Sequence, residues 1–560
     1  MADPTLAALA ERYWRWTCHE FPLTAFMAGM PNDDPTMFRE APADFERRAH
    51  EAAALLAELD AIAMAPLGVA DAATHRLLRR ELDDLCAFHA LGTHQRPWLL
   101  PVGPEFNTVF FANMVSIGDA QAAERYVDQL ATLPAFVGDV VANLRAGRAR
   151  GYRYPQVVMA RAEGNVRAAI AAEVSALPWY GPFQRSIASH LAPVQAQAER
   201  AKRLIAGQLV PALAALADMM RDELAPSARA SIACTDDAMG SQYYQRWVQH
   251  FTTTDLSPEQ VHALGLTEAA RIEAEIAHVA AAAGYPDDVA GYRRFIADDP
   301  QFVAATADAL RERVEVTAKR IDRQIPAYFG RLPRITYGVE SIPPALASRM
   351  PPAYAQPSPG DGSSAGILWV SGIPALCPLY LVPALALHEG WPGHLMHLAL
   401  MQEAKALPAF RRFNAVKYTA CLEGWALYCE GLGEEMKLYD TPHQRFGRLD
   451  MELWRALRLV VDTGIHAKGW GRQRAIDEMA SRLSLSLATV EGEVDRYIAL
   501  PGQALAYQIG NLKFRELRAR AQAQLGERFK LRDFHDMLMA AGPVTLPVLD
   551  DTVQAWLAAA

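Results

Sequence analysis

The chain contains the run His-Glu-Gly-Trp-Pro-Gly-His over residues 388–394, and this run constrains the fold more than any other segment. Six residues of a regular helix turn through about 600°, so a straight helix would point the two imidazoles in different directions. Pro392 disrupts helical hydrogen bonding, and Gly393 permits backbone angles that other residues avoid. We therefore expect the helix to bulge or break there, which would return His394 to the side of His388.

The residue types in this run are those of a metal site. Metallopeptidases often hold zinc through His-Glu-x-x-His on one helix, with the Glu as general base. His388 and His394 are the candidate ligands here, and Glu389 is the candidate base. His397, three residues further on, is a rival to His394. The alternative, a helix end with incidental histidines, is disfavoured because the four side chains cluster directly after an apolar stretch.

A third ligand is expected downstream, because zinc hydrolases commonly use two His and one Glu and leave a fourth position for water. In gluzincins this Glu lies on a second helix further along the chain, and Glu423 fits that position. Its apolar neighbours predict burial, and a buried carboxylate needs a partner. Glu430, seven residues later, is expected to contact a ligand from behind. The predicted cofactor is therefore Zn²⁺.

Helical periodicity runs through most of the chain and predicts a mainly α fold. Ser257-Pro258-Glu259-Gln260 carries the signals of a helix start, with a capping Ser and a Gln three residues later. We expect a large helical protein with a cleft and a small β element before the metal-binding helix. Further helices are predicted at about 71–91, 119–148, 154–176, 194–224, 302–328 and from 382 to the end.

Two segments interrupt this pattern. Residues 331–375 are rich in Pro, Gly and Ser, with candidate strands at Ile335–Val339 and Ile367–Ser371. Arg96–Gly118 has too many prolines for a helix interior, so it either lines a cleft or connects two helices at the surface. We predict a helical region over 1–330 and a metal-binding catalytic region over 331–560, joined as one continuous large domain.

Composition excludes several classes of protein. A net charge of −9 over 560 residues, without a basic patch, argues against a nucleic-acid partner. The six cysteines form no Cys-x-x-Cys pair, which argues against disulfides and thiolate zinc sites. We find no secretory signal and no apolar run of about 18 residues, so we expect a cytoplasmic protein without a membrane partner. A homodimer is left open.

Several motifs together resemble one bacterial family, called domain of unknown function 885 and grouped with zinc metallopeptidases of the gluzincin type. The resemblance spans roughly residues 335–520 and implies a reaction class better than a substrate. The family often has paired tyrosines in the loop before the metal helix, where this chain has Tyr354-Ala355. The motifs are His-Glu-x-x-Pro-Gly-His, Glu423-Gly-Trp-Ala-Leu-Tyr, Asp462-Thr-Gly-Ile-His466, Arg496-Tyr497 and Pro501-Gly-Gln-Ala-Leu-Ala-Tyr507.

We expect a zinc-dependent hydrolase that cleaves an amide or peptide bond of a short peptide or small amide. Glu389 would take a proton from the metal-bound water and pass it to the leaving nitrogen. His466 and Tyr507 are the candidate donors to the oxyanion, with Asp462 four residues before His466 on the same helical face. For both donors the alternative is a residue that only packs in the core.

Arginine suits the capture of a substrate carboxylate, and Arg496 is the first candidate, followed by Arg458. The competing interpretation is an ion pair with Glu430, Glu452 or Asp495. Tyr354 and Gln503 complete the expected substrate contacts. Two other functions stay open: a metal-dependent enzyme of specialised metabolism with a non-peptide substrate, and a non-catalytic helical scaffold.

Overall fold

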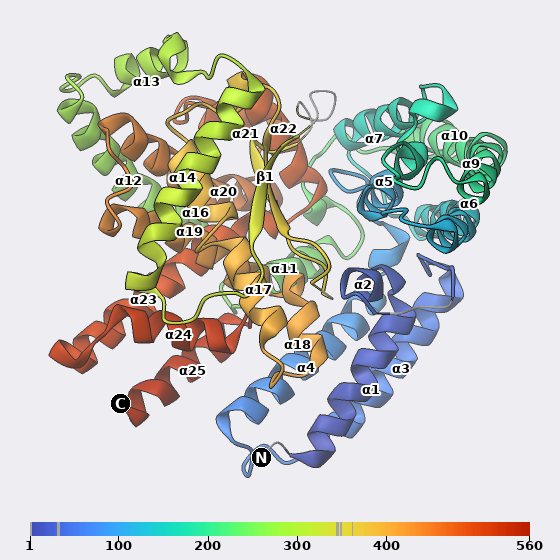
Figure 1. Cartoon of the computed structure of the whole chain (residues 1–560), viewed down its shortest axis with the longest axis horizontal. Coiled ribbons are helices and arrows are strands. Elements are labelled where there is room, and N and C mark those ends of the chain that lie inside the picture. Colours follow the sequence, from blue (N-terminus) through green and yellow to red (C-terminus); the bar gives the residue numbers. More distant parts are fainter. Residues whose placement is uncertain (1–2, 31–33, 343–346, 348–349, 361) are drawn as a thin grey trace.

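The computed structural model describes residues 3–30, 34–342, 347, 350–360 and 362–560. Helices make up most of the chain, and one three-stranded sheet lies among them (Figure 1). The sheet directly precedes the helix that carries His388. This confirms the predicted fold class, a mainly α protein with a small β element before the helix that carries His388.

The N-terminal helices lie on one side of the molecule, drawn in blue in Figure 1. Asp3 caps the first helix by accepting hydrogen bonds from the backbone N–H groups of Thr5 and Leu6, and Pro4 suits the first turn. These helices are α1 (Pro4–Glu20), α3 (Pro42–Asp60) and α4 (Val69–Ala90). A second group, drawn in cyan and green, comprises α5 (Pro104–Met114), α6 (Ala120–Ala149), α7 (Gln156–Ala169), α9 (Ala192–Leu204) and α10 (Val210–Met219).

The C-terminal half is organised around α20 (Pro442–Lys468), which packs along α12 (Pro258–Ala282). The predicted capping box at Ser257 and Gln260 forms at the start of α12. Every residue of α20 from 449 to 466 is buried. A helix enclosed on all sides must supply partners for its own charged side chains, and these side chains reappear around the candidate site.

The sheet is formed by β1 (Tyr337–Ile342), β2 (Ala353–Gln356) and β3 (Gly366–Ser371), in the order β1-β3-β2. β3 runs parallel to β1 and antiparallel to β2. Alternate residues of β3, among them Leu368 and Val370, are buried, which is the pattern of a strand with one face on the core.

The structure differs from the sequence prediction in four places. α5 lies inside the segment 96–118, where we expected no helix, because Pro104 stands in its first turn and costs no hydrogen bond there. α13 (Val289–Asp298) and β2 were not predicted. The first strand begins at Tyr337 rather than at Ile335, while the predicted strand over 367–371 is confirmed within β3.

The hydrophobic core falls into two clusters, and each draws on both halves of the chain. One contains Leu144 and Leu457, and the other contains Tyr13 and Trp425. The division of the chain at residue 330, into a helical region and a metal-binding catalytic region, stays a prediction. Among the described residues, the helical stretch Ala192–Ser227 is long and apolar enough to cross a membrane by length and composition, although one such stretch is weak support for a span.

Two helices, one of which carries Glu423, cross at a pair of glycines. α19 (Thr419–Glu435) and α23 (Ala506–Leu525) pack along each other. A β-carbon on Gly424 would lie 2.4 Å from backbone atoms of Gly510, so the backbones are in direct contact. This close approach fixes the position of Glu423, the residue next to Gly424.

Substituting Gly424 by Ala should destabilise the protein, since overpacking typically costs about 1–3 kcal/mol. Gly431, on the same helix, is the matched control, because a β-carbon there meets no atom within 4 Å. Gly431→Ala should be stabilising by about 0.5–1 kcal/mol. Urea denaturation of both variants measures the difference, and equal stabilities would contradict the close crossing.

Candidate metal site

The helix that carries His388 breaks at the predicted place. α16 (Val382–Glu389) ends directly after this residue, and α17 (His394–Glu403) begins at the second histidine. At Gly393 a β-carbon would lie 1.9 Å from the carbonyl oxygen of His388, so the turn accepts only glycine. The break brings the two imidazole rings to 4.8 Å between centroids.

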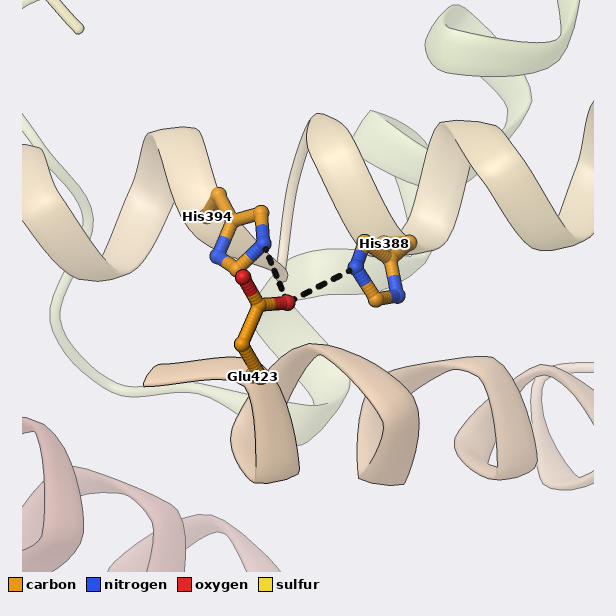
Figure 2. Close-up of side chains that lie close together, drawn as sticks. All are labelled: His388, His394 and Glu423. Carbon is orange, nitrogen blue, oxygen red and sulfur yellow. Dashed lines mark ion pairs between the residues drawn. The ribbon is translucent and has the colours of Figure 1, made fainter. Parts of the chain in front are cut away.

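Glu423 reaches this pair of rings from α19, which lies below the broken helix in Figure 2. Its Oε2 atom is 3.4 Å from Nε2 of His388 and 3.3 Å from Nε2 of His394. One carboxylate oxygen is therefore shared between two imidazole nitrogens. The side chains of the two histidines are nearly buried, and that of Glu423 is 18% exposed.

These distances are those expected between the ligands of a tetrahedral zinc ion. Bonds of about 2.0–2.2 Å in a tetrahedral arrangement separate neighbouring donor atoms by about 3.3–3.5 Å. His388, His394 and Glu423 each offer one ligand atom, and these atoms lie within 4.8 Å of one another. The donor set, two imidazole nitrogens and one carboxylate oxygen, fits zinc.

Glu430, seven residues beyond Glu423 on α19, holds the other ring nitrogen of His388. Nδ1 of His388 lies 2.7 Å from Oε1 of Glu430, and both side chains are buried. A carboxylate on the far nitrogen fixes the tautomer of a ligand and leaves Nε2 free for the metal. The predicted contact between Glu430 and a candidate ligand is therefore present in the structure.

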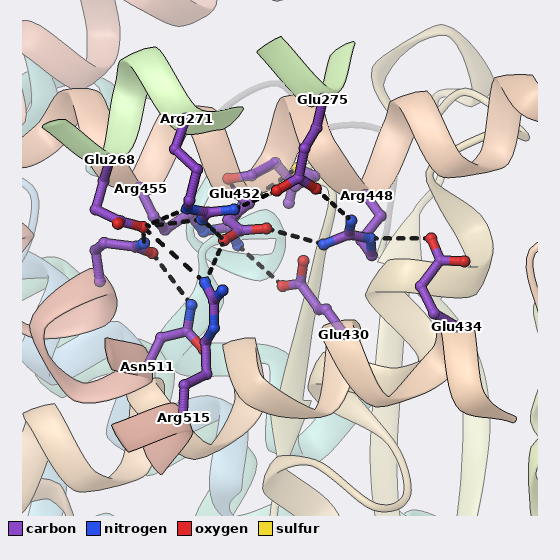
Figure 3. A network of polar contacts seen from close by, with 12 residues as sticks. Glu268, Arg271, Glu275, Glu430, Glu434, Arg448, Glu452, Arg455, Asn511 and Arg515 are labelled. Carbon is purple, nitrogen blue, oxygen red and sulfur yellow. Dashed lines mark hydrogen bonds and ion pairs between the residues drawn. The ribbon is translucent and has the colours of Figure 1, made fainter. Parts of the chain in front are cut away.

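Glu430 in turn belongs to a larger network of charges behind the broken helix, shown in Figure 3. Nη2 of Arg455 lies 3.8 Å from Oε1 of Glu430. Sequence reasoning missed Arg455, although its position three residues before Arg458 places both on one face of α20. Glu452 anchors the rest of the network through ion pairs with Arg271, Arg448 and Arg515.

Replacing Glu430 by Gln should weaken zinc binding about 10–100-fold, because the support of the ligand imidazole loses its charge. Competition with a chromophoric chelator measures this affinity. Glu434→Gln is the matched control on the same helix, since Glu434 pairs with Arg445 and Arg448 rather than with a histidine. An unchanged zinc affinity in the Glu430→Gln variant would show that the contact between Glu430 and His388 does not contribute to zinc binding.

The charges of the site also set the protonation of His388. Burial lowers the pKa of its imidazole, but hydrogen bonds with Glu423 and Glu430 outweigh burial and raise the pKa to about 9. For Glu423 burial opposes ionisation, yet the two histidines hold its pKa below the usual range. The metal-free site is therefore arranged as a protonated imidazole between carboxylates.

Zinc requires a neutral imidazole, so zinc uptake at neutral pH should expel about one proton from His388. Affinity should accordingly rise with pH and level off near pH 9, the pKa of this group. Because the folded pKa is raised, the stability that the proton adds to the metal-free protein should be present below about pH 6.5 and lost towards pH 9. Calorimetry in buffers of different ionisation enthalpy counts the protons; a binding enthalpy that is independent of buffer contradicts the prediction.

Glu389 and Tyr507 lie beside the cluster. Glu389 is the last residue of α16 and remains partly exposed, while burial raises the pKa of its carboxyl against the charges of His388 and His394. Tyr507 lies at the start of α23, and burial followed by the charge of Glu423 raises the pKa of its hydroxyl. The structure thus brings the predicted base and one predicted oxyanion donor to the candidate ligands.

Arg458 and Arg496 share one carboxylate next to Tyr507. Both donate to Oε2 of Glu493, at 3.0 Å and 2.8 Å. The guanidinium of Arg458 also lies 4.4 Å from the centroid of the Tyr507 ring, and Arg496 donates to Gln503 at 2.5 Å. The alternative interpretation of the sequence is an ion pair of these arginines with Glu430, Glu452 or Asp495. In the structure both arginines pair with Glu493 instead.

His466 does not contact the ligands, and this corrects its predicted role as an oxyanion donor. Its Nδ1 accepts a hydrogen bond from the backbone N–H of Cys234, and its Nε2 lies 2.9 Å from the backbone oxygen of Tyr497. Both nitrogens are thus occupied in tying three segments together. Asp462 binds Tyr244 and the N–H of Gly502 rather than His466.

Two further candidates, His397 and Tyr354, are outside the group of ligand atoms. His397 is buried, and among the described residues neither of its nitrogens has a hydrogen-bond partner. Burial lowers its pKa to about 3, and it is outside the group of ligand atoms, so His394 holds the position that we had left open. Tyr354 lies in β2 with its ring stacked on Trp369 at 6.0 Å, which places it on the sheet.

The fold and the site together define a large helical protein with two histidines and one glutamate gathered at a broken helix. Residues 22–553 match the family described as "Bacterial protein of unknown function (DUF885)", and the chain belongs to this family. The family part of the sequence resemblance is therefore confirmed. None of the curated proteins matches the sequence.

Two solved structures share the whole fold. The crystal structure of "the putative lipoprotein from Colwellia psychrerythraea" is 25% identical, with a TM-score of 0.92 and 99% of each chain covered. A "putative lipoprotein of unknown function from Shewanella oneidensis" is 17% identical, with a TM-score of 0.70 and 99% of each chain covered. At 17% identity the second likeness concerns the fold alone.

Proposed function

We propose that this protein is a zinc-dependent hydrolase of gluzincin type that cleaves an amide or peptide bond of a short peptide or small amide. The observation that carries the proposal is the single Glu423 oxygen at 3.3 Å and 3.4 Å from two imidazole nitrogens. A third ligand that comes from a later helix is the gluzincin arrangement, as predicted from the sequence. Bound zinc would lower the pKa of a coordinated water to about 7 and polarise a carbonyl group.

The chain's own residues supply the remaining chemistry. Glu389, next to a ligand and partly exposed, is placed to accept the proton of the attacking water and to donate it to the leaving nitrogen. The raised pKa of Tyr507 keeps its hydroxyl protonated, so it can donate to a developing oxyanion. Glu430 orients His388 and takes no part in the proton transfer.

The residues next to Tyr507 favour substrates that carry a carboxylate. Arg458 and Arg496 hold two positive charges against the one carboxylate of Glu493. Nη1 of Arg458 is buried and, within the part of the chain that the structure describes, has no hydrogen-bond partner. A substrate carboxylate would balance this charge, and a free peptide C-terminus has that chemistry.

The test begins with metal content and continues with substrates. The purified chain should bind zinc with a stoichiometry of about one, as a site of three ligands and water requires. A dipeptide library and a set of non-peptide amides should then be screened with zinc-loaded and chelator-treated protein. Hydrolysis of peptides supports the proposal, hydrolysis of other amides alone shifts it to specialised metabolism, and failure to take up zinc refutes it.

Where the protein acts is also a proposal. The sequence favours a cytoplasmic protein, whereas the description as lipoproteins belongs to the two structural neighbours. Cell fractionation with an antibody against the native chain would decide the location.

A further inference from the structure

A cavity of about 50 Å³, separate from the candidate metal site, lies where distant parts of the chain meet. None of the candidate ligands lines it. A buried water needs roughly 10–15 Å³ of such space, so the cavity has room for several waters or one small oxyanion. The lining comes from residues 96–99, 153–158, 229–243 and 498–501.

Positive charge prevails in this lining. Its lining residues include three arginines, Arg96, Arg153 and Arg229, but only one acidic residue, Asp237. Nη1 of Arg153 donates to the backbone oxygens of Arg148 and Tyr152, so this guanidinium has neutral acceptors. The carboxylate of Asp237 is itself engaged: Oδ1 accepts the backbone N–H of Arg153 at 3.1 Å, and Oδ2 lies 3.4 Å from Nη1 of Arg96. Asp236, the next acidic residue, is exposed and does not line the cavity.

The side chain of Arg96 is held by its neighbours, and one of its N–H donors has no partner among the described residues. It is 6% exposed, and its guanidinium carbon lies 4.1 Å and 3.8 Å from the ring centroids of Tyr152 and Tyr243. Its terminal nitrogens donate to the backbone oxygens of Ala238 and Leu91. Its Nε is buried and has no partner among the described residues. A buried N–H without an acceptor is costly, so Arg96, a residue of the cavity lining, carries one unsatisfied donor.

Arg229 is bound chiefly to neutral acceptors. Its Nε donates to the backbone oxygen of Arg153 at 3.0 Å, and its Nη1 donates to that of Ser231 at 2.6 Å. Burial, the largest cause, lowers the pKa of Arg229; the charges of Asp237 and Asp236 act against burial, and the charge of Arg96 acts with it. Carbonyl groups orient the guanidinium but do not neutralise it, so the charge in the cavity remains in excess.

We propose that this cavity binds a small oxyanion of the phosphate type. The charge of the three lining arginines and the unsatisfied donor of Arg96 match the charge and the oxygen atoms of such an ion. The ion would join four parts of the chain: the segment after α4, the turn before α7, the segment that carries Arg229 and the loop after Tyr497. That loop continues through Gly502 to Tyr507. A bound ion would therefore also hold in place the segment that leads to the candidate metal site.

Thermal unfolding in inorganic phosphate tests the proposal. At constant ionic strength, with chloride as the balancing anion, the midpoint temperature should rise with the logarithm of phosphate concentration. Phosphate can also bind zinc, so the titration is repeated after chelation, and the shift should persist. The outcome therefore does not depend on the proposed hydrolase function.

Two variants locate the ion. Arg229→Gln and Arg153→Gln should each reduce phosphate affinity at least tenfold by isothermal titration, with circular dichroism to confirm folding. Arg474→Gln is the control, because Arg474 is exposed and its guanidinium lies over the ring of Trp470. This variant should retain full affinity for phosphate. Phosphate and chloride with equal effects on the unsubstituted chain would overturn the proposal, and so would unchanged affinity in both cavity variants.

Discussion

Substituting Glu389 by Gln should lower the rate of amide hydrolysis by about 10²–10⁴-fold, the usual contribution of a general acid–base residue. Glutamine keeps the size and position of the side chain at the end of α16 but cannot accept a proton. Glu389 is outside the group of candidate ligands, so zinc content should not change. Steady-state rates on the best substrate, together with metal analysis of the same samples, measure both effects.

The matched control is Glu527→Gln, which makes the same chemical change at an exposed position outside the site. It should leave both rate and zinc content unaltered. A Glu389→Gln enzyme with full zinc and undiminished rate would remove Glu389 from the mechanism. Loss of zinc together with activity would instead make it a ligand.

Removal of Glu423 should abolish zinc binding. Its Oε2 is the atom that lies near both histidines, so Glu423→Gln takes away the negative charge shared by the two. The loss of affinity should exceed the roughly 10–100-fold typical of a residue that only supports a ligand. Zinc retained after dialysis against a weak chelator measures this loss, and activity should fall with it.

His397→Leu distinguishes the two possible histidine ligands. Because His397 is buried and neutral, with no hydrogen bond to either nitrogen among the described residues, an apolar side chain of similar size should replace it at little cost. This variant should keep its zinc, whereas His394→Ala should lose it. The reverse result would move the ligand to His397 and refute the geometry of the broken helix.

Much of the candidate metal site could be predicted because its signals are local. Proline and glycine between the two histidines predict a helix break from backbone chemistry alone, and the break occurs there. The seven-residue spacing of Glu423 and Glu430 places both on one face of a helix, and both contact His388. The apolar neighbours of Glu423 predicted its burial, whereas its side chain is 18% exposed.

The roles of His466, Arg458 and Arg496 could not be predicted in the same way. Their partners are Cys234, Tyr497 and Glu493, and the contact with Cys234 spans 232 positions of the chain. A histidine inside a motif has the same local sequence whether it faces a substrate or holds two backbone segments together. Only the packing of α20 between its neighbours separates these roles.

The sequence by itself determined that the chain is mainly helical, where the helix that carries His388 must break and which few side chains can meet there, with His394 and His397 left as rivals. Periodicity, backbone chemistry and residue type act over a few positions, so they can be read without the fold. The tertiary structure decided which oxygen the histidines share, which charges surround Arg455 and Arg458, and where the arginine-lined cavity lies. These features depend on helices far apart in sequence that pack at fixed distances, as the contact between Gly424 and Gly510 illustrates.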